Sequence, residues 1–396
     1  MQAHDEVVIL SGVRTPIGAF LGSLSSLTAP QLGAVAIREA VSRAGIEATD
    51  LDEVLMGCVL QGGIGQAPAR QAAIFGGVPQ SVPCTTVNKV CGSGMKTVMM
   101  ATQAIRVGDA RFVLAGGMES MSNAPYLLDK ARTGYRMGNG SILDSMVHDG
   151  LWDPYNNCHM GNCGDATSAA FEFSREALDA FAAESYRRAV EAQTSGRFGD
   201  EIAPVEVPQR KGDPMVVAED EEPGKGQPAK LGSLRPAFSK EGVTTAGNAS
   251  SIDDGAAALV VASGAVARER GLKPLARVVG YAQHAQEPQW FTTAPAAAVK
   301  KLLDRHGLTV DDVDLFEINE AFAVVAMVVA KQLGIPHESL NVNGGAVALG
   351  HPIGMTGARL VLTAIHELKR RGGRYAVCSP CIGGGEATAI LIENLG

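Results

Sequence analysis

Charged residues are scarce in this sequence. Asp, Glu, Lys and Arg make up 19% of its 396 residues, against roughly 25% in typical soluble domains. We therefore expect a large buried surface, either inside the chain or between subunits. The 42 acidic residues outnumber the 34 basic ones, and the basic residues form no cluster. This balance argues against a nucleic-acid partner.

Long hydrophobic runs are also missing. The longest run, residues 321–330, is far shorter than the ~20 residues that a membrane span needs, so we expect a soluble protein with no membrane partner. Residues 1–10 contain neither a basic segment nor an Arg/Ser-rich presequence, and a cytoplasmic location is the resulting expectation. The seven cysteines are too few for a disulfide framework in a chain of this length and are expected to be reduced thiols.

The chain contains an internal repeat. Residues 43–52 (RAGIEATDLD) match residues 305–314 (RHGLTVDDVD) at a constant offset. A helical apolar pattern precedes each copy, and each copy is followed by a strand, a Val-Asn pair, a glycine-rich turn, a helix and another strand. This alternation predicts the α/β class with largely buried sheets.

An insertion separates the two copies. The closing strand of the second copy, 385–392, follows at once, whereas its counterpart, 255–261, arrives only after a long interruption. The expected domains are an N-terminal half over 1–118, completed by 250–271, an inserted loop domain over 119–249, and a C-terminal half over 272–396.

Several elements can be placed from the local pattern. Within the insertion, Ser174 is expected to cap a helix over 175–192, and the Pro/Gly/charged stretch 208–230 is expected to be exposed. Further helices are expected over 93–106 and from 319 to about 333, and strands near 7–10, 54–56, 112–115, 315–318 and 375–378.

Cys91 is the first candidate for chemistry. It precedes the helix expected at 93–106, and the unpaired N–H groups and dipole of a helix N-terminus favour a thiolate. The Gly-Ser-Gly that follows lets a substrate approach the sulfur. A buried structural cysteine is the common alternative, but the glycines favour a nucleophile.

His351 occupies the turn of the second copy that matches the Cys91 turn of the first. Glycines and a proline hold it in Gly-His-Pro-Ile-Gly, which suits a general base, although an isolated histidine is more often structural. Asn319 is either the N-cap of the helix that follows it or the holder of a water or a substrate oxygen.

Cys381 opens Cys-Ile-Gly-Gly-Gly, whose glycine N–H groups could bind an oxyanion. Cys378 and Cys381 also form Cys-Ser-Pro-Cys, which suggests a redox pair or half of a zinc site, with Cys158, His159 and Cys163 as the other half. We disfavour both alternatives, because a redox Cys-x-x-Cys is expected at a helix N-terminus and the spacing of the second group is unusual. No metal is therefore expected.

Taken together, the motifs resemble those of the thiolases, in particular the acetyl-CoA C-acetyltransferases. They are NKVCGSGM at 88–95, GGMESMS at 116–122, AGNAS at 246–250, NEAFA at 319–323, GHPIG at 350–354 and CIGGG at 381–385. The resemblance implies the thiolase fold, a layered helix and sheet sandwich of two βαβαβαββ halves with a loop domain inserted in the first. It also implies a homotetramer built as a dimer of dimers.

The same resemblance implies the reaction, a reversible condensation of two acetyl-CoA to acetoacetyl-CoA and CoA, or thiolysis of 3-ketoacyl-CoA, through an acetyl-cysteine. Cys91, activated by His351, would carry the acetyl group, and Cys381 would move the α-proton and protonate departing CoA. The N–H groups of Cys91 and Gly383 would hold the oxyanion. Asn319 would hold a water beside the enolate oxygen.

CoA and acetyl-CoA are expected as substrates, with no permanently bound cofactor, and no P-loop or dinucleotide fingerprint is present. The family pattern places CoA contacts at His159, Met160, Phe238, Ser250, Ala321 and Phe322.

Three departures from the pattern concern the shape of the acyl pocket. They are Asn-Cys-Gly-Asp at 162–165, Trp290-Phe291 in place of a smaller pair, and Thr356 in place of a common serine. None is expected to touch the catalytic residues.

Three other functions stay open from the sequence. The first is a 3-ketoacyl-CoA thiolase of broader chain length in fatty-acid β-oxidation. A ketoacyl-synthase-like condensing enzyme would lack the second cysteine, Cys381. A catalytically silent CoA- or lipid-binding protein of the same fold would not need the complete catalytic set.

Overall fold

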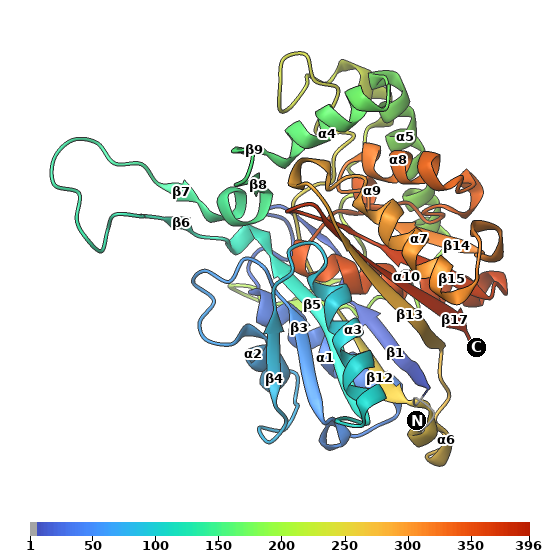
Figure 1. Ribbon diagram of the computed structural model, residues 1–396. Helices are drawn as coiled ribbons and strands as arrows, with labels where there is room; N and C mark the ends of the chain where they lie inside the picture. Colours follow the sequence, from blue (N-terminus) through green and yellow to red (C-terminus); the bar gives the residue numbers. More distant parts are fainter. Residues whose placement is uncertain (1–5) are drawn as a thin grey trace.

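The computed structural model describes residues 6–396, and within them eleven strands form one continuous sheet (Figure 1). Its N-terminal half contains β1 (Val7–Arg14), β12 (Asp253–Ser263), β5 (Phe112–Ser120), β3 (Glu53–Gly57) and β4 (Cys84–Val87), with the short β2 (Gly18–Ala19) beside β12. Its C-terminal half contains β13 (Ala276–Ala285), β17 (Glu386–Asn394), β15 (Tyr375–Ser379) and β14 (Leu315–Ile318), with the short β16 (Cys381–Ile382) beside β17.

The two halves of the sheet repeat one pairing pattern. In the first, β1 pairs antiparallel with β12, β12 antiparallel with β5, and β5 parallel with β3. In the second, β13, β17, β15 and β14 pair in the same order and directions. A parallel bridge between Phe316 and Leu340 takes the place of the β3–β4 pairing. The halves join where β1 pairs with β13, which confirms the predicted duplication.

Helices form layers on both sides of these strands. α3 (Ser93–Val107) and α10 (Ile353–Arg371) pack against each other and contact strands of both halves. α1 (Ala29–Ala44) and α2 (Pro68–Phe75) cover the first half, and α7 (Ala294–His306) covers the second, with α8 (Ala323–Leu333) packed on α7 (Figure 1). A helix enclosed by two layers must be apolar on most of its faces, and α10 is buried along nearly its whole length.

The start of α8 corrects one expectation. The helix begins at Ala323, and Asn319 is not its N-cap. Residues 319–322 instead lie outside the helix, because Phe322 pairs with Ala249 and the carbonyl of Ala321 accepts hydrogen bonds from the N–H and hydroxyl of Ser250. This pairing frees the Asn319 side chain for the site described below.

The insertion contains more regular secondary structure than the expected loop domain. The predicted helix is present as α5 (Arg175–Thr194), and the Ser174 hydroxyl accepts a hydrogen bond from the N–H of Ala177. A second helix, α4 (Met160–Ala170), was not predicted, because its glycines and small residues obscure the helical period. Three short hairpins complete the insertion: β6 (Tyr126–Leu127) with β7 (Leu143–Asp144), β8 (Trp152–Asp153) with β9 (Cys158–His159), and β10 (Val205–Val207) with β11 (Met215–Val217).

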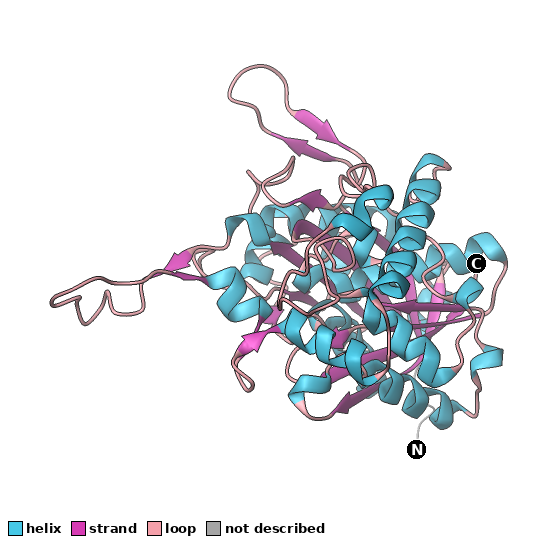
Figure 2. Ribbon diagram, turned by 90° about the horizontal axis from the view of Figure 1, so that it is seen from above, coloured by secondary structure: helices cyan, strands magenta, loops and turns pink. Residues whose placement is uncertain are grey.

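Two hairpins of the insertion project from the body of the molecule (Figure 2). The β6–β7 arm, at the left of Figures 1 and 2, carries exposed Leu128, Met137 and Ile142. The stretch 208–230 is mostly exposed, as predicted, but Asp220 is buried and holds the guanidinium of Arg14 at 2.6 and 2.8 Å.

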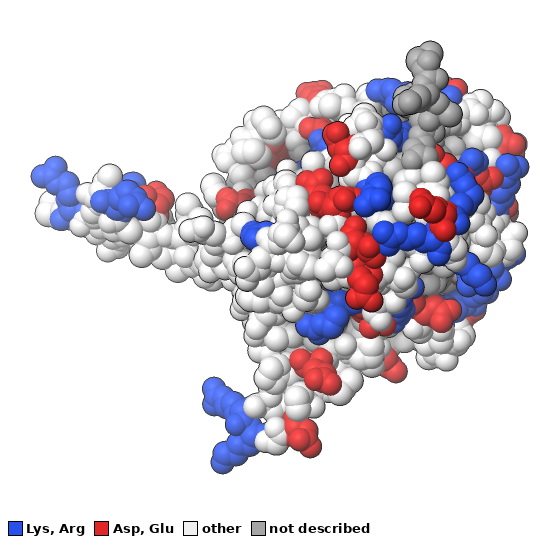
Figure 3. All heavy atoms as spheres, turned by 90° about the horizontal axis from the view of Figure 1, so that it is seen from below, with Lys and Arg blue, Asp and Glu red and all other residues white. Residues whose placement is uncertain are grey.

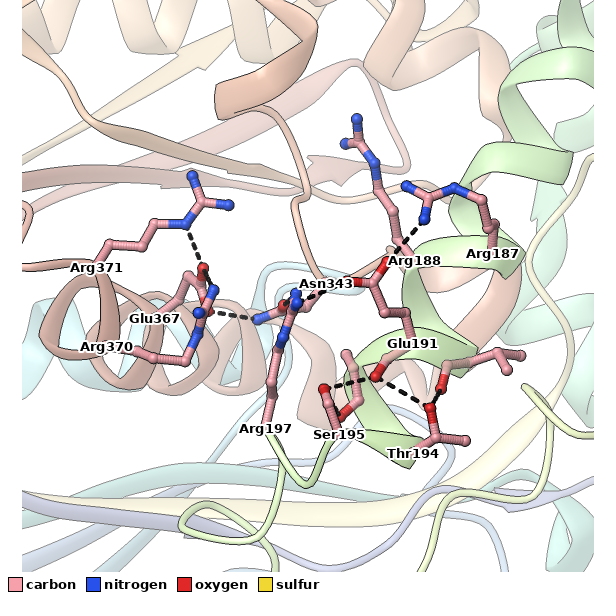
Figure 4. Close-up of polar contacts among 12 residues, drawn as sticks. Arg187, Arg188, Glu191, Thr194, Ser195, Arg197, Asn343, Glu367, Arg370 and Arg371 are labelled. Atoms are coloured by element: carbon pink, nitrogen blue, oxygen red, sulfur yellow. Dashed lines mark hydrogen bonds and ion pairs between the residues drawn. The ribbon is translucent and has the colours of Figure 1, made fainter.

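Polar contacts fasten the insertion to the C-terminal half (Figure 4). Arg197 donates to the Asn343 side chain at 3.1 Å and to Glu191 of α5 at 2.7 Å. Asn343 in turn donates to Glu367 of α10 at 2.9 Å, and Glu367 also accepts from Arg370. The insertion is thereby tied to the central helix that begins next to His351.

Charges of both signs are mixed over the face shown in Figure 3, and blue Lys and Arg atoms lie at the tip of the β6–β7 arm. Among residues 6–396, no helix is both long and apolar enough to cross a membrane.

Candidate active site

Loops from both halves meet at a small cavity of about 40 Å³. Cys91 comes from the first half, His351 from the second, and Met160 from the insertion. The predicted site residues that line this cavity are Cys91, His159, Met160, Ser250, Ala321, Phe322 and His351. A second cavity of about 180 Å³ shares Met160 and Phe291 with it and is also lined by Gly383.

Cys91 stands in a strained turn just before α3. The preceding Val90 has φ of 45°, a left-handed conformation that costs energy for a β-branched residue. The Ser93 hydroxyl closes the turn, since it donates to the Val90 carbonyl at 2.6 Å and accepts from the Lys89 N–H at 2.8 Å. Gly92 lies against the side chain of Ile382, and a Cβ at this position would be 2.3 Å from its terminal methyl group, so that Ile382 would have to move.

The electrostatic environment of Cys91 differs from the one predicted. Burial raises the pKa of its thiol to about 11, while N–H groups of Gly383 and of Cys91 itself act in the opposite direction. Burial therefore outweighs the helix N-terminus, and the expected thiolate is wrong for the resting site. Both N–H groups act on the Cys91 sulfur, so they lie close to where the carbonyl oxygen of a bound thioester would be.

His351 is held as a neutral imidazole. Burial, followed by the charge of Arg359, lowers its pKa to about 3. The Thr356 hydroxyl donates to the Pro352 carbonyl at 2.9 Å, so it accepts from His351 Nδ1–H at 2.6 Å. This fixes the tautomer and leaves the lone pair on Nε2. The backbone N–H of His351 donates to Asp253 of β12 at 2.8 Å, which ties its turn to the first half.

Cys381 is fully buried, and burial and the neighbouring Cys91 both raise its thiol pKa. The two sulfurs therefore belong to one site. Cys378 is held apart, since its sulfur contacts the Leu360 carbonyl of α10 at 3.5 Å. The two cysteines of Cys-Ser-Pro-Cys thus face different surroundings, and neither belongs to a group of metal-ligand atoms found among residues 6–396.

Asn319 lies behind His351, fully buried. Its Nδ2 is 3.5 Å from His351 Nε2, and its Oδ1 has no hydrogen-bond partner. An unpaired buried amide oxygen is costly, so a water or substrate group is expected to complete it.

The predicted CoA-contacting residues form one wall. The rings of His159 and Phe238 stack at 4.5 Å, and Phe238 meets Phe322 edge-on at 6.0 Å. His159 Nδ1 accepts the N–H of Gly161 at 3.1 Å, and a Cβ on Gly161 would lie 2.2 Å from Phe238. The wall is therefore built from the insertion and the start of α8.

Comparison with known proteins identifies this architecture. Residues 7–265 match the family of the thiolase N-terminal domain, and residues 272–394 match that of the thiolase C-terminal domain. The chain belongs to the thiolase family. The predicted thiolase fold is thereby confirmed.

Close relatives cover essentially the whole chain. This thiolase is 53% identical to acetyl-CoA acetyltransferase 2 of Arabidopsis thaliana, covering 98% of this chain and 97% of that protein. Among solved structures, the Acat5 thiolase from Ascaris suum in complex with coenzyme A is 46% identical, with a TM-score of 0.94 over 98% of this chain and 100% of that one. The Bacillus anthracis acetyl-CoA acetyltransferase is 41% identical, with a TM-score of 0.97 over the full length of both chains.

Thr356 and Phe291 correct the expectation that the departures avoid the catalytic residues. Thr356 bonds His351 directly, and Phe291 lines the cavity of this thiolase beside Cys91. The Thr356 contact could have been predicted from the sequence, because Thr356 is a hydroxyl residue five positions after the histidine and lies in the first turn of α10.

Glu119 was not predicted at all. Its buried carboxyl accepts the N–H groups of Val59 at 3.1 Å, Leu60 at 3.0 Å and Gly354 at 2.9 Å. Burial raises its pKa to about 7, against these hydrogen bonds. These contacts link a loop of the first half to the turn that carries His351, so Glu119 holds together two backbone segments of the site of this thiolase.

Proposed function

We propose that this thiolase is an acetyl-CoA C-acetyltransferase, which condenses two acetyl-CoA to acetoacetyl-CoA and CoA and catalyses the reverse thiolysis. The observation that carries the proposal is the convergence of two buried thiols, Cys91 and Cys381, with a neutral His351 and the N–H of Gly383. Acetyl transfer and carbon–carbon bond formation each need one thiol. The relatives named above carry this activity in their names.

In the first half-reaction, Cys91 Sγ attacks the thioester carbonyl while its proton passes to His351 Nε2, which carries no proton and has only a long 3.5 Å contact with Asn319 Nδ2. The carbonyl oxygen becomes an oxyanion, which accepts hydrogen bonds from the N–H groups of Cys91 and Gly383. Collapse of the tetrahedral intermediate expels CoA, which is protonated by Cys381. The product is an acetyl-cysteine.

In the second half-reaction, Cys381 removes a proton from the methyl group of a second acetyl-CoA. The enolate oxygen is stabilised by His351 and by a water bound to Asn319, whose Oδ1 is otherwise unpaired. The enolate carbon attacks the acetyl carbonyl, the C–C bond forms, and Cys91 leaves as a thiol. CoA binds as a substrate along the wall of His159, Phe238 and Ser250 and is not a resident cofactor.

The size of the cavity favours a short acyl group. At about 40 Å³ it has room for only a few atoms, and Met160, Phe291 and Phe322 close it with large apolar side chains. This supports acetyl transfer over the alternative of a 3-ketoacyl-CoA thiolase of broader chain length.

Two experiments test the assignment. Peptide mass spectrometry after incubation with acetyl-CoA should find the acetyl group on Cys91, and label on another residue would refute its role. Cys381→Ala should still be acetylated on Cys91 but should form no acetoacetyl-CoA. Condensation at the wild-type rate by that variant would show that another group removes the α-proton.

We further propose the domain division 1–118 with 250–271, 119–249 and 272–396, and a cytoplasmic homotetramer. The β6–β7 arm supports the assembly, because Met137 is 99% exposed and Leu128 and Ile142 are more than half exposed. Exposed apolar side chains of this kind fit contact with another copy of the chain. Seven free thiols fit a reducing compartment. Sedimentation analysis of a variant lacking 129–141 should give a smaller assembly than the full chain.

A further inference from the structure

Three potential metal ligands meet in the insertion, next to the active site and outside the catalytic machinery. Asp153 ends β8, Cys158 pairs with it across the hairpin on β9, and Cys163 follows in the first turns of α4. One ligand atom from each lies within 4.8 Å of both others. Within residues 6–396, this is the one group of three His, Cys, Asp or Glu side chains that meets that condition.

The distances are close to those of a tetrahedral zinc site. Two thiolates at about 2.3 Å from Zn²⁺ are about 3.8 Å apart, and a thiolate and a carboxylate oxygen slightly less. The Cys163 sulfur already lies 3.8 Å from Asp153 Oδ2. The ligand atoms would have to approach one another by at most about 1 Å, which side-chain rotation can provide.

The donors and their support also fit a metal. Asp153 is held by the N–H groups of Tyr155 at 2.8 Å and Asn156 at 3.2 Å, and by the Asn156 side chain at 2.7 Å. Hydrogen bonds of this kind orient metal-bound carboxylates. Two thiolates with one carboxylate suit Zn²⁺ better than Mg²⁺ or Ca²⁺, which prefer oxygen ligands.

Access and a free coordination position are both available. Asp153 lines the cavity of about 180 Å³, and Cys158 is only half-buried. Three protein ligands leave the fourth position of a tetrahedral ion to water. The segment between the two cysteines contains His159 and Met160, which line the Cys91 cavity, so an ion bound here would fix the backbone on either side of these two residues.

We propose that Asp153, Cys158 and Cys163 form a Zn²⁺ site with water as the fourth ligand. Binding releases the two thiol protons to solvent, and both sulfurs become thiolate ligands. This revises the expectation that the chain binds no metal, and it moves the zinc alternative away from Cys378 and Cys381. The site does not depend on the proposed acetyl transfer.

The test uses the full chain with Cys91→Ala, which removes the reactive thiol of the active site from the measurement. This protein should bind one Zn²⁺ per chain and release two protons. With Co²⁺ in place of Zn²⁺ it should show a thiolate-to-cobalt charge-transfer absorption. Adding Cys158→Ser or Asp153→Asn should weaken binding at least tenfold, and Cys158→Ser should also reduce the release to one proton.

Cys84→Ser is the matched control, because Cys84 is the other half-buried thiol and lies on β4, away from this site. It should leave the affinity unchanged. Amide hydrogen exchange gives a measure that does not depend on the variants, and Zn²⁺ should protect the amides of residues 155–163. Binding that is unaffected by Cys158→Ser, the absence of the charge-transfer band, or a Cys158–Cys163 disulfide that forms in place of metal uptake would each overturn the proposal.

Discussion

The hydrogen bond between Thr356 and His351 can be removed without disturbing its surroundings. Thr356→Val has nearly the same shape and lacks the hydroxyl. The Pro352 carbonyl, which loses a side-chain donor, still accepts the backbone N–H groups of Met355 at 3.1 Å and of residue 356 at 3.0 Å. The change therefore isolates the effect on the imidazole.

Without the hydroxyl, His351 has two poor options. It can keep Nδ1–H buried without an acceptor, or it can move the proton to Nε2 and lose the lone pair that faces the site. Leaving a buried donor unpaired costs about 1–3 kcal/mol. Because the base must carry its proton on Nδ1 for the reaction to start, we expect kcat to fall by about 5- to 150-fold. The KM for acetoacetyl-CoA should change little, since the hydroxyl does not line the cavity.

The assay is steady-state thiolysis of acetoacetyl-CoA, together with the rate of Cys91 acetylation in a single turnover. Both rates should fall by the same factor, because acylation needs the base. Thr356→Ser keeps the hydroxyl and should retain kcat within about twofold, although it loses one buried methyl group, worth about 0.8 kcal/mol of stability. If Thr356→Val is also within twofold of the wild type while remaining folded, the tautomer argument is wrong.

Three further outcomes follow from the structure. Because burial raises the pKa of Cys91 to about 11, its alkylation by iodoacetamide should speed up about tenfold per pH unit from pH 7 to 10, and a plateau below pH 8 would instead indicate a preformed thiolate. Phe291→Leu should raise the ratio of kcat/KM for longer 3-ketoacyl-CoA to kcat/KM for acetoacetyl-CoA by about tenfold, since one methylene in an apolar pocket is worth about 1–3 kcal/mol. An unchanged ratio would mean that the Phe291 ring does not limit chain length. Asp220→Asn should lower the free energy of unfolding in urea by about 3 kcal/mol, because it removes a carboxylate that balances the buried charge of Arg14. Glu219→Gln, at the exposed neighbouring position, should change this free energy by less than about 0.5 kcal/mol, and equal effects of the two substitutions would contradict this account.

The repeat made most of the fold predictable. Strands β14 and β15 begin at the expected residues, and β12 was found from its counterpart β17 despite the intervening insertion. The start of α8 was misplaced because the non-helical conformation of residues 319–322 depends on contacts with residues 249–250. These partners are about 70 positions away in the sequence, and no local pattern reports them.

The candidate site was predictable as a set of residues but not as an environment. The sequence motifs predicted Cys91, His351 and Cys381 as site residues, and the fold places them together. The position of Cys91 before a helix predicted that the helix dipole would lower the pKa of its thiol, whereas burial in the folded protein raises this pKa. Desolvation depends on every neighbour in space, so sequence position alone could not weigh it against the dipole.

The opposite pKa shifts of Cys91 and His351 define how the first step has to proceed. Burial raises the pKa of the Cys91 thiol to about 11 and lowers that of the His351 imidazole to about 3, so both shifts oppose a thiolate–imidazolium pair before substrate binds. We therefore expect the proton to leave Cys91 as its sulfur attacks the thioester, and not in a separate earlier step. In the proposed mechanism the negative charge then passes to the carbonyl oxygen, which accepts hydrogen bonds from the N–H groups of Cys91 and Gly383, and the buried resting thiol stays protonated until a substrate is bound.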